Sequence, residues 1–167
     1  MLNTSLEGTE STNSGDFTAA NDFRKITLIK DPQNAAGSAA SAATLRGTYA
    51  IRINSSPTPG TFTADEEINQ ASTGAVGKVV EFDSTNLILY YYQTRFPDVG
   101  TDSNGNLTAF SGANAITGQS SSASATPDTS NSNTVNGVSF SSGYSNPELA
   151  YDSGDMIYVE ERSPITR

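Results

Sequence analysis

The residues best suited to acid–base chemistry are two groups of neighbouring carboxylates, Asp65-Glu66-Glu67 and Glu160-Glu161. General acid–base catalysis and glycoside hydrolysis both need two carboxylates that face one cleft. Adjacent residues of a strand point to opposite faces of a sheet, so neither pair of glutamates forms such a site by itself. We therefore expect these carboxylates to lie in solvated loops or at partner contacts, and we predict no catalytic residues.

Two further segments resemble ligand-binding loops. The turn at 98–106 is rich in Asp and Asn, which offer oxygen ligands to calcium, but its residues do not follow the order of an EF-hand loop. Segment 72–79 superficially resembles a phosphate-binding loop, but it lacks the first glycine and the Ser or Thr that should follow Lys78. We predict an ordinary Asx-rich turn, and no metal or cofactor site.

The most aromatic segment is Tyr90-Tyr91-Tyr92, with Phe96 nearby. Such rings can stack on sugars or on nucleic-acid bases. In a strand, Tyr91 points to the face opposite Tyr90 and Tyr92. We expect one face to belong to the core and the other to cover a neighbouring layer or subunit, and a sugar-binding platform is the alternative.

The composition of the 167-residue chain excludes several common kinds of site. It contains no His, Cys or Trp, which excludes Ser-His-Asp and Cys-His triads, Cys/His zinc sites, thiol redox chemistry and disulfides. The net charge of −9 repels phosphate backbones and anionic lipids, so we expect no nucleic-acid and no membrane partner. No apolar run approaches the roughly 20 residues of a membrane-spanning helix, and no basic-then-apolar leader follows Met1.

The abundance of small polar residues is the basis for the fold class that we predict. Ser, Thr, Asn and Gly make up 71 of the 167 residues, which suits strands joined by long turns rather than helical bundles. We predict an all-β fold with antiparallel strands in a sandwich-like or complex architecture with long polar loops. Residues 1–22 nearly lack apolar side chains and are predicted to form a flexible N-terminal arm.

The β-rich structural domain is predicted to cover residues 23–167. Strand patterns occur at 23–29, at 45–53 and at 155–162, and a hairpin is predicted where 79–82 and 87–92 flank a polar tetrapeptide. The alanine-rich segment 35–43 has no apolar stripe, so we expect a surface loop there. Segment 119–136 contains six serines and almost no large apolar residue, and we expect a long, exposed, poorly ordered low-complexity loop.

One internal similarity bears on the fold. Phe62, Ile68, Ser72 and Ala75 are each followed 48 residues later by a residue of the same type, at Phe110, Ile116, Ser120 and Ala123. Two copies of a β-unit would produce this pattern. Ser and Ala are common in this chain, however, and we slightly favour the interpretation that chains built of strands and turns fall into such spacings.

Four separate blocks of the chain resemble one protein family. They are 23–32 (FRKITLIKDP), 79–96 (VVEFDSTNLILYYYQTRF), 107–112 (LTAFSG) and 146–165 (NPELAYDSGDMIYVEERSPI). In this order they resemble the baseplate wedge protein called gene product 8 in contractile-tailed phages of the T-even type. Members of that family are considerably longer, so the resemblance implies a partial or shortened member.

The resemblance implies an all-β structural protein of the phage tail baseplate, located in the virion after synthesis in the host cytoplasm. It implies a homo-oligomer, in the form of a dimer, that contacts other wedge proteins. The family has no known enzymatic role, so we expect no catalysis, no cofactor and no small-molecule substrate. The alternative is a receptor- or glycan-binding β-module of a virion or cell-surface protein, which would present Tyr90, Tyr92 or Tyr144 in a solvent-facing groove.

Overall fold

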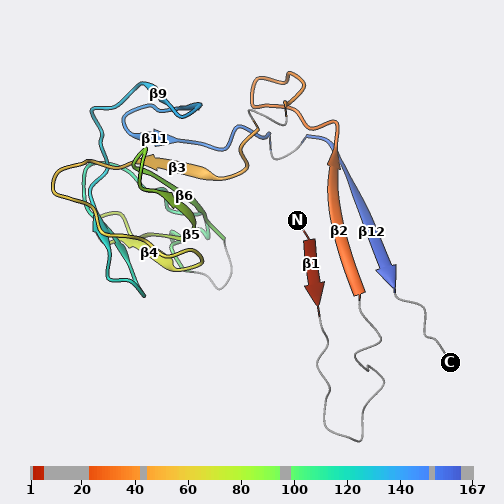
Figure 1. Ribbon diagram of the computed structural model, residues 1–167, viewed down its shortest axis with the longest axis horizontal. Coiled ribbons are helices and arrows are strands. Elements are labelled where there is room, and N and C mark those ends of the chain that lie inside the picture. The colour runs from red at the N-terminus through yellow and green to blue at the C-terminus, as the bar shows by residue number, and fades with distance from the viewer. Residues whose placement is uncertain (1, 6–22, 42–44, 95–98, 151–152, 163–167) are drawn as a thin grey trace, which may run out of the picture. The chain divides into compact units, whose positions relative to one another are not determined.

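The computed structural model describes residues 2–5, 23–41, 45–94, 99–150 and 153–162, and all regular elements of these residues are β-strands (Figure 1). The prediction of an all-β fold is therefore confirmed. Two compact units divide the chain, one formed by Met1–Ser41 with Leu149–Arg167 and the other by Ala42–Glu148. The predicted β-rich domain contributes to both units. The predicted N-terminal arm lies outside the described residues except for β1 (Leu2–Ser5).

The first unit contains a three-stranded antiparallel sheet in the order β1-β2-β12 (Figure 1). The central strand is β2 (Phe23–Lys30), and β12 (Asp155–Arg162) pairs with it over all eight residues. The strands predicted at 23–29 and 155–162 are thus confirmed. Described residues of segment 35–43 form turns, as predicted, and the Asn34 side chain accepts hydrogen bonds from the backbone of Ala36 and Ser38.

Residues of opposite charge occupy facing positions of β2 and β12. The register places three basic residues of β2 opposite three acidic residues of β12: Lys30 opposite Asp155, Lys25 opposite Glu160, and Arg24 opposite Glu161. A shift by one residue in either direction would keep a single facing pair of opposite charge, Arg24 with Glu160 or Lys25 with Glu161. The observed register therefore has more such pairs than either neighbouring register.

The second unit contains a seven-stranded antiparallel sheet in the order β11-β3-β6-β5-β4-β7-β8, with a separate two-stranded hairpin. The strand predicted at 45–53 contains the shorter β3. The bounds of the sheet strands are β3 (Tyr49–Arg52), β4 (Glu67–Gln70), β5 (Ala75–Asp83), β6 (Ile88–Tyr92), β7 (Ile116–Gly118), β8 (Ser124–Ala125) and β11 (Tyr144–Ser145), and the separate hairpin consists of β9 (Thr134–Val135) and β10 (Val138–Ser139).

This large sheet closes on itself. The residues after β8 pair with the residues after β3, where Ile53 and Pro127 form a β-bridge. The backbone N–H of Asn54 donates to the carbonyl of Thr126 (2.9 Å), and the N–H of Asp128 donates to the carbonyl of Arg52 (2.8 Å). Closure pairs the strand edges that an open sheet would leave exposed.

The closed sheet surrounds the main apolar core. Six strands contribute buried side chains to this cluster, among them Ile51, Leu89, Val79, Ile68, Ile116 and Ala125. A second cluster lies on the opposite face of β3 and β6, where Ala50 and Ile88 pack with Val138 and Phe140 from the β9–β10 hairpin and its exit. Because side chains alternate along a strand, one sheet supplies both clusters.

The hairpin predicted around the polar tetrapeptide 83–86 is confirmed as β5–β6. Its turn is held by Asp83, whose carboxylate accepts hydrogen bonds from the backbone N–H groups of Thr85 and Asn86 (3.0 Å each) and from the Asn86 amide (2.7 Å). Hydrogen bonds from Asn86 and then from Thr85 outweigh slight burial and hold the pKa of Asp83 below its usual value. The turn is therefore encoded locally.

The 48-residue similarity corresponds to two hairpins with the same register. Ile68 faces Gly77 in the β4–β5 hairpin, and the residues 48 positions later, Ile116 and Ala125, face each other in the β7–β8 hairpin. The first strands of the two hairpins pair antiparallel at the equivalent positions Asn69 and Thr117. The two hairpins are thus related by a local two-fold axis, and Ile68 and Ile116 occupy equivalent positions in them.

Segment 119–136 also differs from its predicted exposure. Ala123 and Ala125 are buried in the main core, and Pro127 is fully buried. A Cβ atom on Gly60 would lie 2.7 Å from the Cα atom of Ala123, so the two backbones are in close contact. Low apolar content misled the prediction because small side chains allow the backbone itself to pack tightly against the sheet.

The equivalent turns of the two hairpins give a stability prediction. Gly74 has a φ of 76°, and Ser122, 48 residues later, has a φ of 58°. Since a side chain is strained in this left-handed region, Ser122→Gly is expected to raise the free energy of unfolding by about 0.5 kcal/mol, and Gly74→Ser to lower it by about 1 kcal/mol. Urea denaturation of both variants measures this, and effects of the same sign would contradict the equivalence of the two turns.

Candidate functional site

The outer edge of β12 is a candidate assembly surface. β12 pairs with β2 on one side, and on its other side no strand partner occurs among the described residues. A strand edge with unpaired N–H and C=O groups is a template for pairing with another chain. In the second unit, by contrast, closure and the two-residue strands β8 and β11 leave only short edges. The eight-residue β12 is thus the longest edge strand of the described sheets.

A second candidate site is an open pocket of about 260 Å³ on the face of the large sheet that carries the second cluster. Its wall on β5 lies at a β-bulge between Val79 and Glu81. A bulge adds an extra residue to one strand and re-aims its side chains. The lining residues come from the segment before β3, from β5, from β6 and from the β9–β10 turn: Arg46, Thr48, Val80, Glu81, Asp83, Tyr90 and Asn136.

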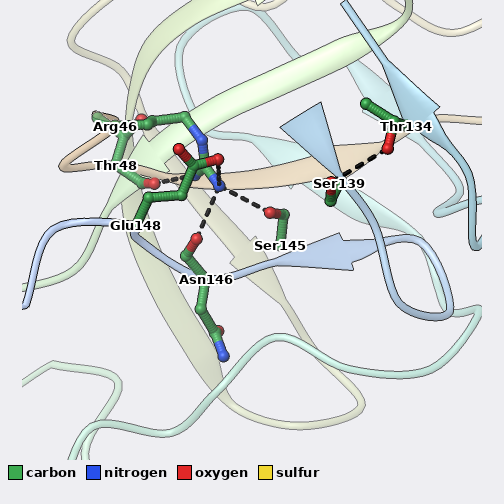
Figure 2. Close-up of polar contacts among 7 residues, drawn as sticks. All are labelled: Arg46, Thr48, Thr134, Ser139, Ser145, Asn146 and Glu148. Atoms are coloured by element: carbon green, nitrogen blue, oxygen red, sulfur yellow. Dashed lines mark hydrogen bonds and ion pairs between the residues drawn. The ribbon is translucent and has the colours of Figure 1, made fainter. Parts of the chain in front are cut away.

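Arg46 lines this pocket, and Figure 2 shows the polar contacts that hold its side chain in place. Its guanidinium donates to the carbonyl of Thr48, to Ser145 Oγ (2.7 Å) and to the carbonyl of Asn146 (2.7 Å). Glu148 lies 3.9 Å away and balances its charge. Arg46 therefore ties the segment after β11 to the sheet. In the separate β9–β10 hairpin, the hydroxyls of Thr134 and Ser139 are hydrogen-bonded at 3.1 Å, as Figure 2 also shows.

Charges of both signs act on the Tyr90 hydroxyl in this pocket. Burial raises its pKa most, the negative charges of Asp83 and Glu81 raise it further, and Arg46 opposes them. Asn136 donates a long hydrogen bond of 3.4 Å to Asp83 Oδ2. The pocket thus brings together a phenol, a guanidinium, two carboxylates and an amide within one small volume.

The predicted carboxylate group 65–67 does not form a site of paired acids. Asp65 and Glu67 are exposed, whereas Glu66 is only 5% exposed. Glu66 accepts hydrogen bonds from the backbone N–H groups of Thr63 (2.6 Å), Ser121 (2.9 Å) and Ser120 (3.2 Å), and from Ser121 Oγ. The expectation of a solvated or partner-contacting carboxylate is wrong for Glu66, because these donors replace water around it.

The environment of Glu66 keeps it ionised. Burial raises its pKa, but the hydrogen bonds from Ser121, Thr63 and Ser120 outweigh this effect, and the pKa lies below its usual value. A carboxylate with such a pKa is a poor proton donor at neutral pH. Glu66 instead links the start of β4 to the turn of the β7–β8 hairpin. The Glu160-Glu161 pair lies on β12, where its backbone faces Lys25 and Arg24.

The other predicted segments have structural roles. Asp102 Oδ1 accepts hydrogen bonds from the backbone of Asn104 (2.8 Å) and Asn106 (2.9 Å), which confirms an Asx-rich turn; Asp98 lies outside the described residues. Segment 72–79 forms the β4–β5 turn and the start of β5. No group of three acidic, His or Cys residues suited to a metal occurs in the part of the chain that the structure describes.

The three tyrosines of β6 alternate as predicted. Tyr91 is buried and stacks on Tyr49, with ring centroids 5.3 Å apart, and its edge meets Phe110 at 4.9 Å. Tyr92 is 40% exposed, and Tyr90 lines the pocket. Tyr144 donates its hydroxyl to the carbonyl of Gly112 (2.7 Å). Phe96 lies outside the described residues.

Sequence reasoning missed most of the pocket. Arg46 and Thr48 were predicted only as part of the strand at 45–53, and Asn136 only as part of the low-complexity loop at 119–136. No local pattern connects these residues, since they belong to separate segments that the fold brings together.

Comparisons with family models, with curated proteins and with solved structures found no match. Within the described residues, no helix has the length and apolar character needed to cross a membrane.

Proposed function

We propose that this chain is a structural subunit of the tail baseplate wedge of a T-even-type phage and acts through protein–protein assembly without catalysis. The observation that carries the assembly role is the edge of β12, which offers eight residues of backbone for pairing with another strand. Main-chain hydrogen bonds along such an edge join two chains without any special side-chain chemistry.

The placement in a baseplate wedge is supported by where the resembling sequence blocks lie in the fold. Block 23–32 contains β2, block 79–96 contains most of the β5–β6 hairpin, and block 146–165 contains β12. The resemblance therefore includes both strands of the longest pairing in the first unit. It implies a location in the virion, after synthesis in the host cytoplasm, and contacts with other wedge proteins.

We propose a second copy of the chain as the partner at the β12 edge. Antiparallel pairing of β12 with the β12 of another copy is isologous, so it produces a closed dimer with two-fold symmetry. It would join two three-stranded sheets into one sheet of six strands, with no free edge at the junction. Other wedge proteins would bind elsewhere on this dimer.

The proposed assembly is tested by the solution mass of the purified chain, measured by light scattering over a concentration series. We expect a mass twice that of the 17.5-kDa chain, with dissociation only on dilution. The same measurement after mixing with candidate wedge proteins is expected to show a larger complex. A monomer at every concentration that also ignores the wedge proteins would contradict the proposal.

A further inference from the structure

The pocket beside Tyr90 contains polar groups that the protein leaves available to a ligand. Among the described residues, the hydroxyls of Tyr90 and Thr48 and the carboxylate of Glu81 form no hydrogen bond. A hydroxyl both donates and accepts, and a carboxylate accepts. The amide of Asn136 adds a further donor and acceptor. Donors and acceptors thus converge on one small volume.

Most of the charged groups in the pocket already have partners. Arg46 pairs with Glu148 at 3.9 Å, and Asp83 accepts hydrogen bonds from the backbone of Thr85 and Asn86. An anionic ligand would be attracted by Arg46 and repelled by the two carboxylates of the pocket. Arg46 is also held by Ser145 and its neighbours and cannot turn away without breaking those bonds. This arrangement favours a neutral ligand that carries several hydrogen-bonding groups.

The apolar part of the lining indicates the shape of that ligand. The Tyr90 ring and the Val80 side chain, which is 43% exposed, offer apolar surface next to the polar groups. Sugars present C–H groups on the faces of the ring and hydroxyls around its rim, so they match a wall of this mixed kind. The volume of about 260 Å³ lies below the range of roughly 300–1,000 Å³ typical of drug-sized ligands, which suits a single sugar ring.

We propose that this pocket binds one neutral sugar residue, free or at the end of a glycan, with Tyr90 and Val80 against the ring and with Glu81, Thr48 and Asn136 hydrogen-bonded to its hydroxyls. This binding site is independent of the β12 edge. The solution mass of the chain therefore tests assembly alone, and a sugar titration tests this pocket alone.

The test is an NMR titration of the ¹⁵N-labelled chain with D-glucose, D-galactose, D-mannose, N-acetylglucosamine and their disaccharides. We expect saturable shift changes with at least one of these sugars, confined to amides at 46–48, 80–83, 90 and 136. L-Arginine, added as a cationic probe, is expected to cause no saturable shifts there. Absence of saturation with every sugar, or saturation with L-arginine at this pocket, would overturn the proposal.

Three variants make the assignment specific. Tyr90→Ala is expected to weaken sugar binding by roughly tenfold or more, because the ring face is lost. Tyr92→Ala is the matched control, since Tyr92 lies on the same strand, is 40% exposed and does not line the pocket; its binding is expected to match that of the unmodified chain. Glu81→Gln changes only an exposed side chain and is expected to weaken binding about threefold to tenfold.

The Glu81→Gln variant keeps the test valid if Tyr90→Ala disturbs the second cluster, against which Tyr90 packs. Equal binding by the Glu81→Gln chain and the unmodified chain would overturn the assignment of Glu81. Equal loss of binding in Tyr90→Ala and Tyr92→Ala would overturn the assignment of the site.

Discussion

Replacing Glu66 by alanine is expected to lower the free energy of unfolding by about 3–5 kcal/mol, the largest effect of any single carboxylate in the described residues. The substitution removes the acceptor of three backbone N–H groups, at Thr63, Ser120 and Ser121. These hydrogen bonds are partly buried, so water replaces the lost carboxylate only in part around each N–H group. Urea denaturation of the variant and of the unmodified chain measures the difference.

Glu67→Ala is the matched control for this prediction. Glu67 is the next residue along the chain and is exposed, so its loss is expected to change stability by less than about 0.5 kcal/mol. Similar losses in the two variants would show that the buried hydrogen bonds of Glu66 do not hold the two hairpins together.

Acid titration provides a second readout for Glu66. Because the pKa of Glu66 is lower in the folded chain than in the unfolded chain, its ionised form stabilises the fold. This contribution is complete above the usual pKa of 4.5 and is lost as the pH falls through the lower folded value. Glu66→Gln does not titrate at this position and should lose less stability than the unmodified chain as the pH falls below 4.5. Parallel stability curves would contradict this expectation.

Gln70→Ala is expected to lower the free energy of unfolding by about 2–4 kcal/mol. Gln70 is fully buried, its amide donates to the carbonyl of Asn114 (2.9 Å), and its Oε1 accepts from the N–H of Ser111 (2.9 Å) and from Thr73 Oγ1 (3.0 Å). Truncation leaves these groups without their partners and opens a cavity. Gln70 therefore connects the β4–β5 hairpin to the segment before β7.

Gln119→Ala makes the same change at an exposed position, where the amide forms one long hydrogen bond of 3.4 Å to Thr117. Its effect on urea denaturation is expected to remain below about 0.5 kcal/mol. If Gln70→Ala were as mild as Gln119→Ala, the hydrogen bonds between the β4–β5 hairpin and the segment before β7 would not contribute to stability.

Features encoded within a few residues could be predicted from the sequence. The β5–β6 hairpin was predicted because apolar runs flank a polar tetrapeptide whose Asp83 organises the turn. The strands β2 and β12 were predicted from β-favouring residues and alternation. The alternation of Tyr90, Tyr91 and Tyr92 also follows from strand geometry alone.

Features that depend on distant segments were not predicted. Closure of the sheet pairs residues after β3 with residues after β8, more than 70 positions later, and such pairing leaves no periodic pattern in the sequence. The burial of Glu66 likewise depends on donors at Ser120 and Ser121, which only the fold places beside it. The pocket brings together Arg46 and Asn136, which lie far apart in the sequence of the second unit.

The proposed assembly through β12 is tested most directly by two single proline substitutions, Ile157→Pro and Tyr158→Pro. Successive N–H groups of an antiparallel strand point alternately to its two sides, so one of these residues donates toward β2 and the other toward the outer edge. Proline removes the N–H group. The variant that loses the N–H group facing β2, the inward variant, is expected to lose strand signal in circular dichroism. The variant that loses the N–H group facing the outer edge, the outward variant, is expected to keep that signal.

Light scattering of the outward variant then decides the question. The account predicts a folded chain with the 17.5-kDa mass of a monomer at concentrations where the unmodified chain is a dimer. A folded outward variant that remains a dimer at those concentrations would contradict assembly through the edge of β12.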